Sequence, residues 1–199
     1  MKRSKFVDLP RLKKSKRQAI KPLSLAITAA LVGCSSNSGE DVVVVNSVDD
    51  CVANTSFDQE QCTMAYQKAL NEAEKTAPQY NSRYDCESEF GNSSCRENSS
   101  GFFMPFMTGY LISSAINSIS NQRYFHPVYT YQGRSGSSRV LSDGTPLKSM
   151  GSGRYKAPAN TSTKAMPAVT RTISRGGFGS KASAKASWGT SRSSGSWGG

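Results

Sequence analysis

The five cysteines are the residues of this chain whose positions most directly indicate chemistry. Cys34 differs from the other four because it ends the sequence "LVGC" after a run of small and apolar residues, 23–33. An aliphatic residue, a branched residue, Gly and Cys in this order match the bacterial lipobox, whose thiol takes a diacylglycerol before the preceding peptide is removed. We therefore expect Cys34 to be lipidated and to become the first residue of the mature chain.

The residues before Cys34 support this expectation. Residues 1–22 contain nine Lys or Arg and one acid, Asp8. The apolar run that follows is long enough for a signal peptide but shorter than the roughly 20 residues that span a bilayer as a helix. We predict a lipoprotein signal peptide over residues 1–33 and a polar tether over residues 34–41. The alternative is a short buried helix that ends on a core cysteine.

A lipidated Cys34 predicts that the protein resides in the bacterial cell envelope. Each buried methylene of an acyl chain contributes about 0.8 kcal/mol, so several chains anchor a protein without a transmembrane helix. An Asp directly after the lipidated cysteine favours the inner membrane, whereas this chain has Ser35. We therefore expect the periplasmic face of the outer membrane rather than the inner membrane, with the membrane as a partner through the lipid.

The other four cysteines lie in a repeated pattern. "NSVDDC" at residues 46–51 returns as "NSRYDC" at residues 81–86, and a further cysteine follows each copy, Cys62 and Cys95. In each copy the Ser can cap a short helix and the acid three residues later can complete a capping box. Oxidising conditions favour disulfides, although four cysteines permit three pairings. Because each copy reads as a unit, we predict Cys51–Cys62 and Cys86–Cys95.

A zinc site is the alternative use of these cysteines. The chain has no C-x-x-C sequence and a single histidine, His126, whereas structural zinc needs four ligands. We therefore predict neither a metal nor another cofactor. With no nucleophile–base pair and no carboxylate pair beyond those that caps and solvated faces explain, we also predict no catalytic residues and no enzymatic activity.

Residues 42–100 are expected to form a small acidic domain that the disulfides stabilise. Residues 42–45 are four valines and predict a strand. Alanines and Cys62 recur at three- and four-residue steps between Asp58, a helix cap, and Pro78, a helix stop, which predicts an amphipathic helix. Residues 101–121 predict an apolar and amphipathic helix. Whether that helix belongs to the core or inserts into lipid or a partner's groove stays open.

Charge divides the chain after residue 132. Residues 34–132 contain five Lys or Arg and twelve Asp or Glu. Residues 133–199 contain eleven Lys or Arg and a single acid. The second part also holds 12 of the 17 glycines. We therefore predict a mostly disordered basic tail over residues 122–199. The expected fold class is a small mainly-α disulfide-stabilised domain with little β, followed by a long, largely disordered Gly/Ser-rich basic tail.

The basic tail predicts weak contact with an anionic envelope surface or an envelope protein. The residues that would make this contact are Arg171, Arg175, Lys181 and Lys185. Flexible cationic chain attracts anionic head groups without a defined geometry. Nucleic acid is not an expected partner, because an exported protein would rarely meet it.

Several longer motifs resemble one protein family. The sequences "QCTMAYQKALNEAEKTAPQY", "DCESEFG", "FFMPFMTGY" and "TRTISRGGFG" are similar to those of the YgiB-like family of uncharacterised enterobacterial-type lipoproteins. The resemblance covers nearly the whole mature chain and implies no activity. Together with the lipobox, it favours a non-catalytic binding or scaffold protein at the outer membrane. The alternatives are an envelope enzyme without a recognisable site and a cytoplasmic basic protein that binds nucleic acid.

Overall fold

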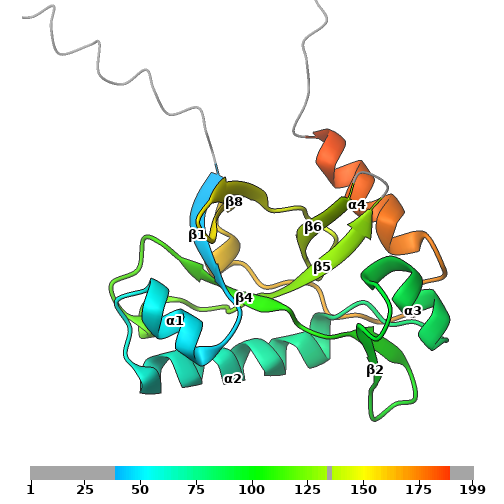
Figure 1. Ribbon diagram of the computed structural model, residues 1–199, viewed down its shortest axis with the longest axis horizontal. Coiled ribbons are helices and arrows are strands. Elements are labelled where there is room, and N and C mark those ends of the chain that lie inside the picture. Colours follow the sequence, from blue (N-terminus) through cyan, green and yellow to red (C-terminus); the bar gives the residue numbers. More distant parts are fainter. Residues whose placement is uncertain (1–38, 134–135, 189–199) are drawn as a thin grey trace, which may run out of the picture. The chain divides into compact units, whose positions relative to one another are not determined.

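The four valines lie, as predicted, in a strand, β1 (Gly39–Val45), at the middle of the main sheet (Figure 1). The computed structural model describes residues 39–133 and 136–188. Within them, six antiparallel strands follow the order β6-β5-β4-β1-β8-β7. The other strands of this sheet are β4 (Gly109–Ser113), β5 (Pro127–Gly133), β6 (Gly136–Leu141), β7 (Lys148–Gly151) and β8 (Arg154–Pro158).

The two ends of this sheet approach each other through the chain that enters β7. The backbone N–H of Leu147 donates to the carbonyl oxygen of Arg139 in β6 at 2.9 Å. The N–H of Leu141 donates to the carbonyl oxygen of Thr145 at 2.9 Å. The sheet therefore curls into a nearly closed barrel, which leaves little of the strand edge unpaired.

Side chains along the strands point alternately into the barrel and toward its outer face. The buried residues inside are Val42, Val44, Leu111, Val128, Leu141, Leu147 and Ala157. Their neighbours in sequence, such as Val45, Tyr110 and Val140, belong to clusters on the outer face. Because successive side chains of a strand point to opposite faces, each strand serves both cores.

Three helices precede β4, and side-chain caps mark where each begins. They are α1 (Val48–Asn54), α2 (Gln59–Thr76) and α3 (Arg83–Phe90). The Oγ of Ser47 accepts from the Asp50 N–H at 3.0 Å, and the Oγ of Ser82 accepts from the Asp85 N–H at 3.1 Å. The repeated motif therefore opens two helices, as predicted. Neither acid completes the expected capping box, because Asp50 accepts from the N–H of Asn46 and Asp85 accepts from the hydroxyl of Ser82.

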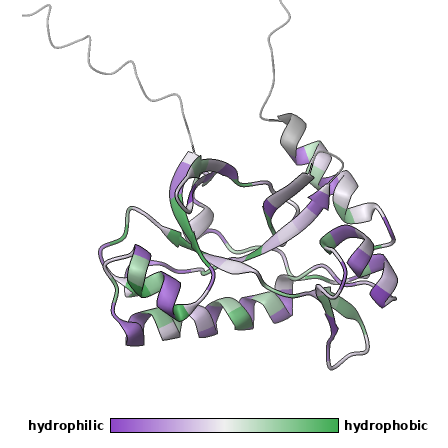
Figure 2. Cartoon of the chain, in the orientation of Figure 1, coloured by the Kyte–Doolittle hydropathy of each residue, from purple (hydrophilic) through white to green (hydrophobic). Residues whose placement is uncertain are grey.

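The helix α2 has the predicted amphipathic form. Asp58 caps it and forms a capping box with Gln61, and the helix ends two residues before Pro78. Its buried face consists of Cys62, Ala65, Ala69, Ala73 and Thr76. Hydrophilic and hydrophobic colours alternate along it in Figure 2. The small alanines let α2 pack with β4, where Tyr110 and Ile112 share its core cluster.

A second group of elements packs around Phe178. It comprises α3, the hairpin of β2 (Cys95–Glu97) with β3 (Phe103–Pro105), and α4 (Gly177–Trp188). Phe178 is fully buried, and its ring centroid lies 5.0 Å from that of Phe90 and 5.8 Å from that of Tyr131. The helix α4 is thus part of the core of the fold.

The expectation of a mainly-α fold is wrong, and residues 101–121 are one reason. They form β3, β4 and a short 3-10 helix (Ile119–Asn121) instead of an apolar helix. All five residues of β4 are buried, because the barrel interior covers one face and α2 helps to cover the other. A strand that is buried on both faces has a continuous apolar sequence, which periodicity cannot distinguish from a helix.

The expectation of a disordered basic tail over residues 122–199 is also wrong within the described residues. Four of the six strands of the main sheet, a second 3-10 helix (Thr161–Thr163) and α4 come from this segment. Its apolar residues are sparse, yet Val128, Leu141 and Ala157 all reach the barrel interior. In strands with one exposed face, polar residues separate the few buried ones, so composition alone resembles disorder.

The start of β1 also changes the predicted domain limits. Gly39 already pairs with Pro158, so the last residues of the expected tether belong to the sheet. The predicted signal peptide and Cys34 lie outside the described residues.

Candidate functional site

The first disulfide joins the two helices that cover β1 and β4. Cys51 in α1 and Cys62 in α2 are bonded, with their Cα atoms 5.9 Å apart, and both residues are completely buried. The phenol of Tyr110 donates to the carbonyl oxygen of Cys62 at 3.4 Å. This is the local pair that the repeat predicts. Its burial in a hydrophobic cluster indicates a structural bond rather than a reactive one.

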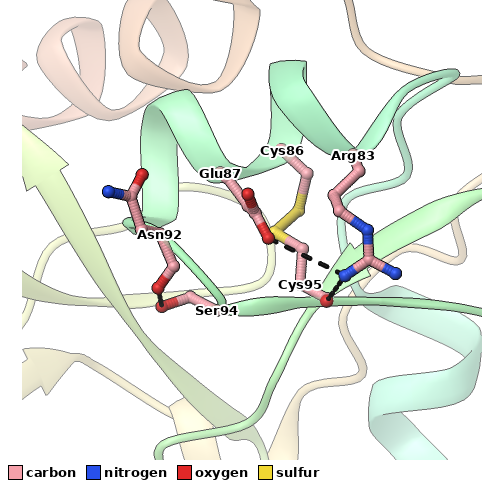
Figure 3. Close-up of polar contacts among 6 residues, drawn as sticks. All are labelled: Arg83, Cys86, Glu87, Asn92, Ser94 and Cys95. Atoms are coloured by element: carbon pink, nitrogen blue, oxygen red, sulfur yellow. Dashed lines mark hydrogen bonds and ion pairs between the residues drawn. A yellow bond between two sulfur atoms is a disulfide. The ribbon is translucent and has the colours of Figure 1, made fainter.

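The second disulfide joins Cys86 in α3 to Cys95 in β2 (Figure 3). Nη1 of Arg83 donates to the carbonyl oxygen of Cys95 at 2.9 Å and lies 3.7 Å from Oε1 of Glu87. The guanidinium also lies 5.2 Å from the ring centre of Phe103. Arg83 therefore reinforces the connection between α3 and the β2–β3 hairpin, so this predicted pair too is part of a structural unit.

Glu89 is a buried carboxylate that sequence reasoning missed. Its Oε2 accepts from the N–H of Gly179 in α4 at 3.0 Å and from the hydroxyl of Tyr80 at 3.3 Å. Its Oε1 has no hydrogen-bond partner within residues 39–133 and 136–188. Burial raises the pKa of Glu89, while the hydrogen bonds from Gly179 and Tyr80 oppose that rise. The carboxylate thus attaches the first turn of α4 to α3.

His126 has a structural environment. It is completely buried, and its Nε2 lies 2.7 Å from the carbonyl oxygen of Thr161, so this nitrogen donates the hydrogen bond. The ring stacks on Tyr124 with centroids 5.9 Å apart. His126 therefore connects β5 to the second 3-10 helix rather than facing solvent.

The four cations that the sequence singles out occupy two kinds of position. Arg171 and Arg175 lie in the segment before α4, and Lys181 and Lys185 lie four residues apart on α4. The guanidinium of Arg175 lies 5.2 Å from the ring centre of Tyr84. All four side chains belong to exposed residues, but Arg175 and Lys185 already have partners in the fold.

Lys185 forms an ion pair with Asp143 and also donates to Oγ1 of Thr145 at 3.1 Å. Burial opposes ionisation of Asp143, but hydrogen bonds from Lys185 and Thr145 outweigh it and lower the pKa of the carboxyl group. The role of Lys185 is therefore to hold α4 to the turn before β7, and of the four cations Arg171 and Lys181 are the better placed for an external contact.

A depression of about 410 Å³ lies on the outer face of the sheet, beside the end of α1. We call it the β1 depression. Val43 forms its floor and pairs directly with Ile112 on β4 and with Arg154 on β8. Because directly paired residues of antiparallel strands share a face, these three side chains lie side by side. The remaining lining residues are Asn54, Thr55, Ser56, Phe57, Ser113, Ser114, Ile116 and Ser152.

The β1 depression combines an apolar floor with a polar rim. Val43, Phe57 and Ile112 provide the floor. Rim side chains without a hydrogen bond to another residue of the described chain are those of Ser56, Ser114, Ser152 and Arg154. No sequence motif identified this site, because its residues come from distant strands and meet only through the sheet register.

Two other kinds of feature, a metal site and a membrane-spanning helix, are absent from the described residues. Within residues 39–133 and 136–188, no three His, Cys, Asp or Glu side chains gather closely enough to hold a metal ion. None of the described helices is both long and apolar enough to cross a membrane.

Comparison with known proteins identifies the family. Residues 39–189 match the family described as "Protein of unknown function (DUF1190)", from the first residue of β1 to just past α4. The chain belongs to this family. The DUF1190 match therefore includes both disulfides, the whole barrel and the β1 depression, and it confirms the family that the sequence motifs indicated.

Curated relatives of this DUF1190 chain are named UPF0441 proteins. The protein of Serratia proteamaculans (strain 568) is 34% identical, with 90% of each chain covered. The protein of Sodalis glossinidius (strain morsitans) is 35% identical, also with 90% of each chain covered. That of Yersinia enterocolitica is 32% identical over 90% of this chain and 89% of its own. No solved structure matches the DUF1190 chain.

Proposed function

We propose that this DUF1190 chain is a lipid-anchored protein of the bacterial outer membrane that binds an envelope component and catalyses no reaction. The observation that carries the proposal is the pair of buried disulfides downstream of the lipobox at Cys34. Disulfides persist in the periplasm and are rare in the cytosol, so they support export independently of the signal sequence. Export argues against a nucleic-acid partner.

A binding role is supported by where the polar groups lie. Two of the ionisable groups with perturbed pKa values, Glu89 and Asp143, hold α4 in place. His126 faces a backbone carbonyl in the core. The side chains of the β1 depression, by contrast, have hydrogen-bonding capacity that the rest of the described fold does not use. We assign Arg171 and Lys181 as auxiliary contacts to anionic envelope surfaces, because opposite charges attract without defined geometry.

Changing Cys34 to Ser should remove the protein from the outer-membrane fraction. The acyl chains are the proposed anchor. Without them the protein loses about 0.8 kcal/mol of membrane-binding free energy for each buried methylene. The measurement is fractionation of the producing cells, with the wild-type chain and the Cys34→Ser variant detected by immunoblot. The disulfides of the variant should be intact, since both bonds lie in the separate unit 38–199.

Two results of this fractionation would contradict the proposal. One is a wild-type chain that stays in the cytoplasm. The other is a Cys34→Ser variant that remains with the outer membrane as fully as the wild type does.

A further inference from the structure

We propose that the β1 depression binds a single sugar residue that carries a carboxylate. The inference rests on the proposed function, because it specifies the envelope component that the protein would bind. It depends on three properties of the depression: its size, its apolar floor with a polar rim, and the guanidinium of Arg154.

The size of the depression suits one sugar residue. Its volume of about 410 Å³ corresponds to about 14 water molecules at ~30 Å³ each. A hexuronic acid has a similar number of non-hydrogen atoms. The volume lies at the lower end of the range of roughly 300–1,000 Å³ in which small-molecule sites fall.

The lining suits the amphipathic character of a sugar ring. Val43, Ile112 and Phe57 can cover the C–H face of the ring. The hydroxyls of Ser56 and Ser114 can both donate and accept, as sugar hydroxyls do. Asn54 and Thr55, at the end of α1, add polar groups to the same rim. A purely apolar ligand would leave these groups without hydrogen bonds, at a cost in free energy.

The charge around Arg154 favours an anionic group on that sugar. The register aligns Val43 with Arg154 and, two residues earlier on β1, Asp41 with Lys156. Asp41 is the acid that faces Arg154, and its Oδ1 is paired with Nζ of Lys156 at 2.8 Å. Arg154 itself has no salt bridge within the described residues.

On α1, the carboxylate of Asp50 is also occupied. Asp50 accepts hydrogen bonds from the side chains of Asn46 and Asn54. The two cations of β8 thus face one carboxylate that Lys156 already pairs, which leaves the guanidinium of Arg154 for a ligand. A guanidinium binds a carboxylate through two parallel hydrogen bonds, which are among the strongest that a side chain makes.

The test is a titration of the full-length, ¹⁵N-labelled protein with glucuronate, followed by NMR. Glucose serves as the neutral ligand of the same ring size. Glucuronate should shift the backbone amide signals of residues 54–57, 113–114 and 152–154. Its dissociation constant should be at least about tenfold lower than that of glucose, because glucose lacks the group that the guanidinium binds.

Three variants separate the role of Arg154 from that of overall charge. Arg154→Gln should reduce glucuronate binding to the level of glucose, and Arg154→Lys should restore only part of it, because an ammonium makes no bidentate contact. Lys148→Gln removes the same charge from β7, outside the depression, and should bind glucuronate as the wild type does. An unchanged melting temperature checks that each variant is folded.

The inference is overturned if glucose binds as tightly as glucuronate, if Arg154→Gln binds as the wild type does, or if the shifted signals map to α4. It is also overturned if decanoate shifts these signals and glucuronate does not, because the site would then take an amphiphile. None of these results bears on the proposed membrane location, because the titration uses purified protein. The fractionation experiment tests that location separately.

Discussion

Replacing Phe178 with Ala should lower the free energy of unfolding by about 3–5 kcal/mol, the range for truncating a buried aromatic side chain. Phe178, in the first turn of α4, is completely buried in contact with the rings of Phe90 and Tyr131. Its removal leaves a cavity where α4, α3 and β5 meet. In a chain of this size, each kcal/mol shifts the melting temperature by about 2–4 °C, so we expect a loss of at least about 6 °C.

Thermal denaturation followed by circular dichroism measures this effect. Ser183→Ala is the matched control, because Ser183 is an exposed residue of the same helix and makes no side-chain hydrogen bond within the described chain. The control should melt within about 2 °C of the wild type. If Phe178→Ala also melts like the wild type, α4 does not belong to the core.

Replacing both Cys51 and Cys62 with Ala should destabilise the protein by about 3 kcal/mol. The bond closes a short loop, with 11 residues of sequence separation, and constraining such a loop in the unfolded chain accounts for most of this value. Since both residues are fully buried, the double variant also loses packing between α1 and α2. Urea denaturation at constant pH gives the free energy directly.

Two comparisons make the disulfide result specific. Cys34→Ser should leave the free energy of unfolding unchanged, because Cys34 precedes the folded unit. Adding a reductant should destabilise the wild type by more than it destabilises the Cys51→Ala/Cys62→Ala variant, which retains only the Cys86–Cys95 bond. A wild-type protein with four free thiols after purification from the envelope would refute the structural role of both bonds.

Features that depend on neighbouring residues were predictable from the sequence. The β-branched run of β1, the caps at Ser47 and Ser82, and the extent of α2 follow from residues only a few positions apart. The disulfides belong to the same class, with sequence separations of 11 and 9. In each case the chemistry acts within a short segment, so the pattern in the sequence is the cause of the structure.

Features that depend on long-range pairing were not predictable. The apolar sequence of β4 is compatible with a helix or a strand. It forms a strand because one of its faces packs in the barrel interior and the other against α2, and both contacts involve residues distant in the sequence. Glu89 looked like a solvated acid because Gly179, which donates to it, comes 90 residues later. The β1 depression was missed for the same reason, since Val43, Ile112 and Arg154 become neighbours only through the register of three strands.

Export and lipid anchoring, on which the proposed function depends, can be tested by intact mass spectrometry of the protein purified from the cells that produce it. We expect a chain that begins at Cys34, carries acyl groups on that residue, and has a mass lower by four hydrogens because of the Cys51–Cys62 and Cys86–Cys95 bonds. A chain that retains Met1, with Cys34 unmodified and the other cysteines reduced, would contradict it.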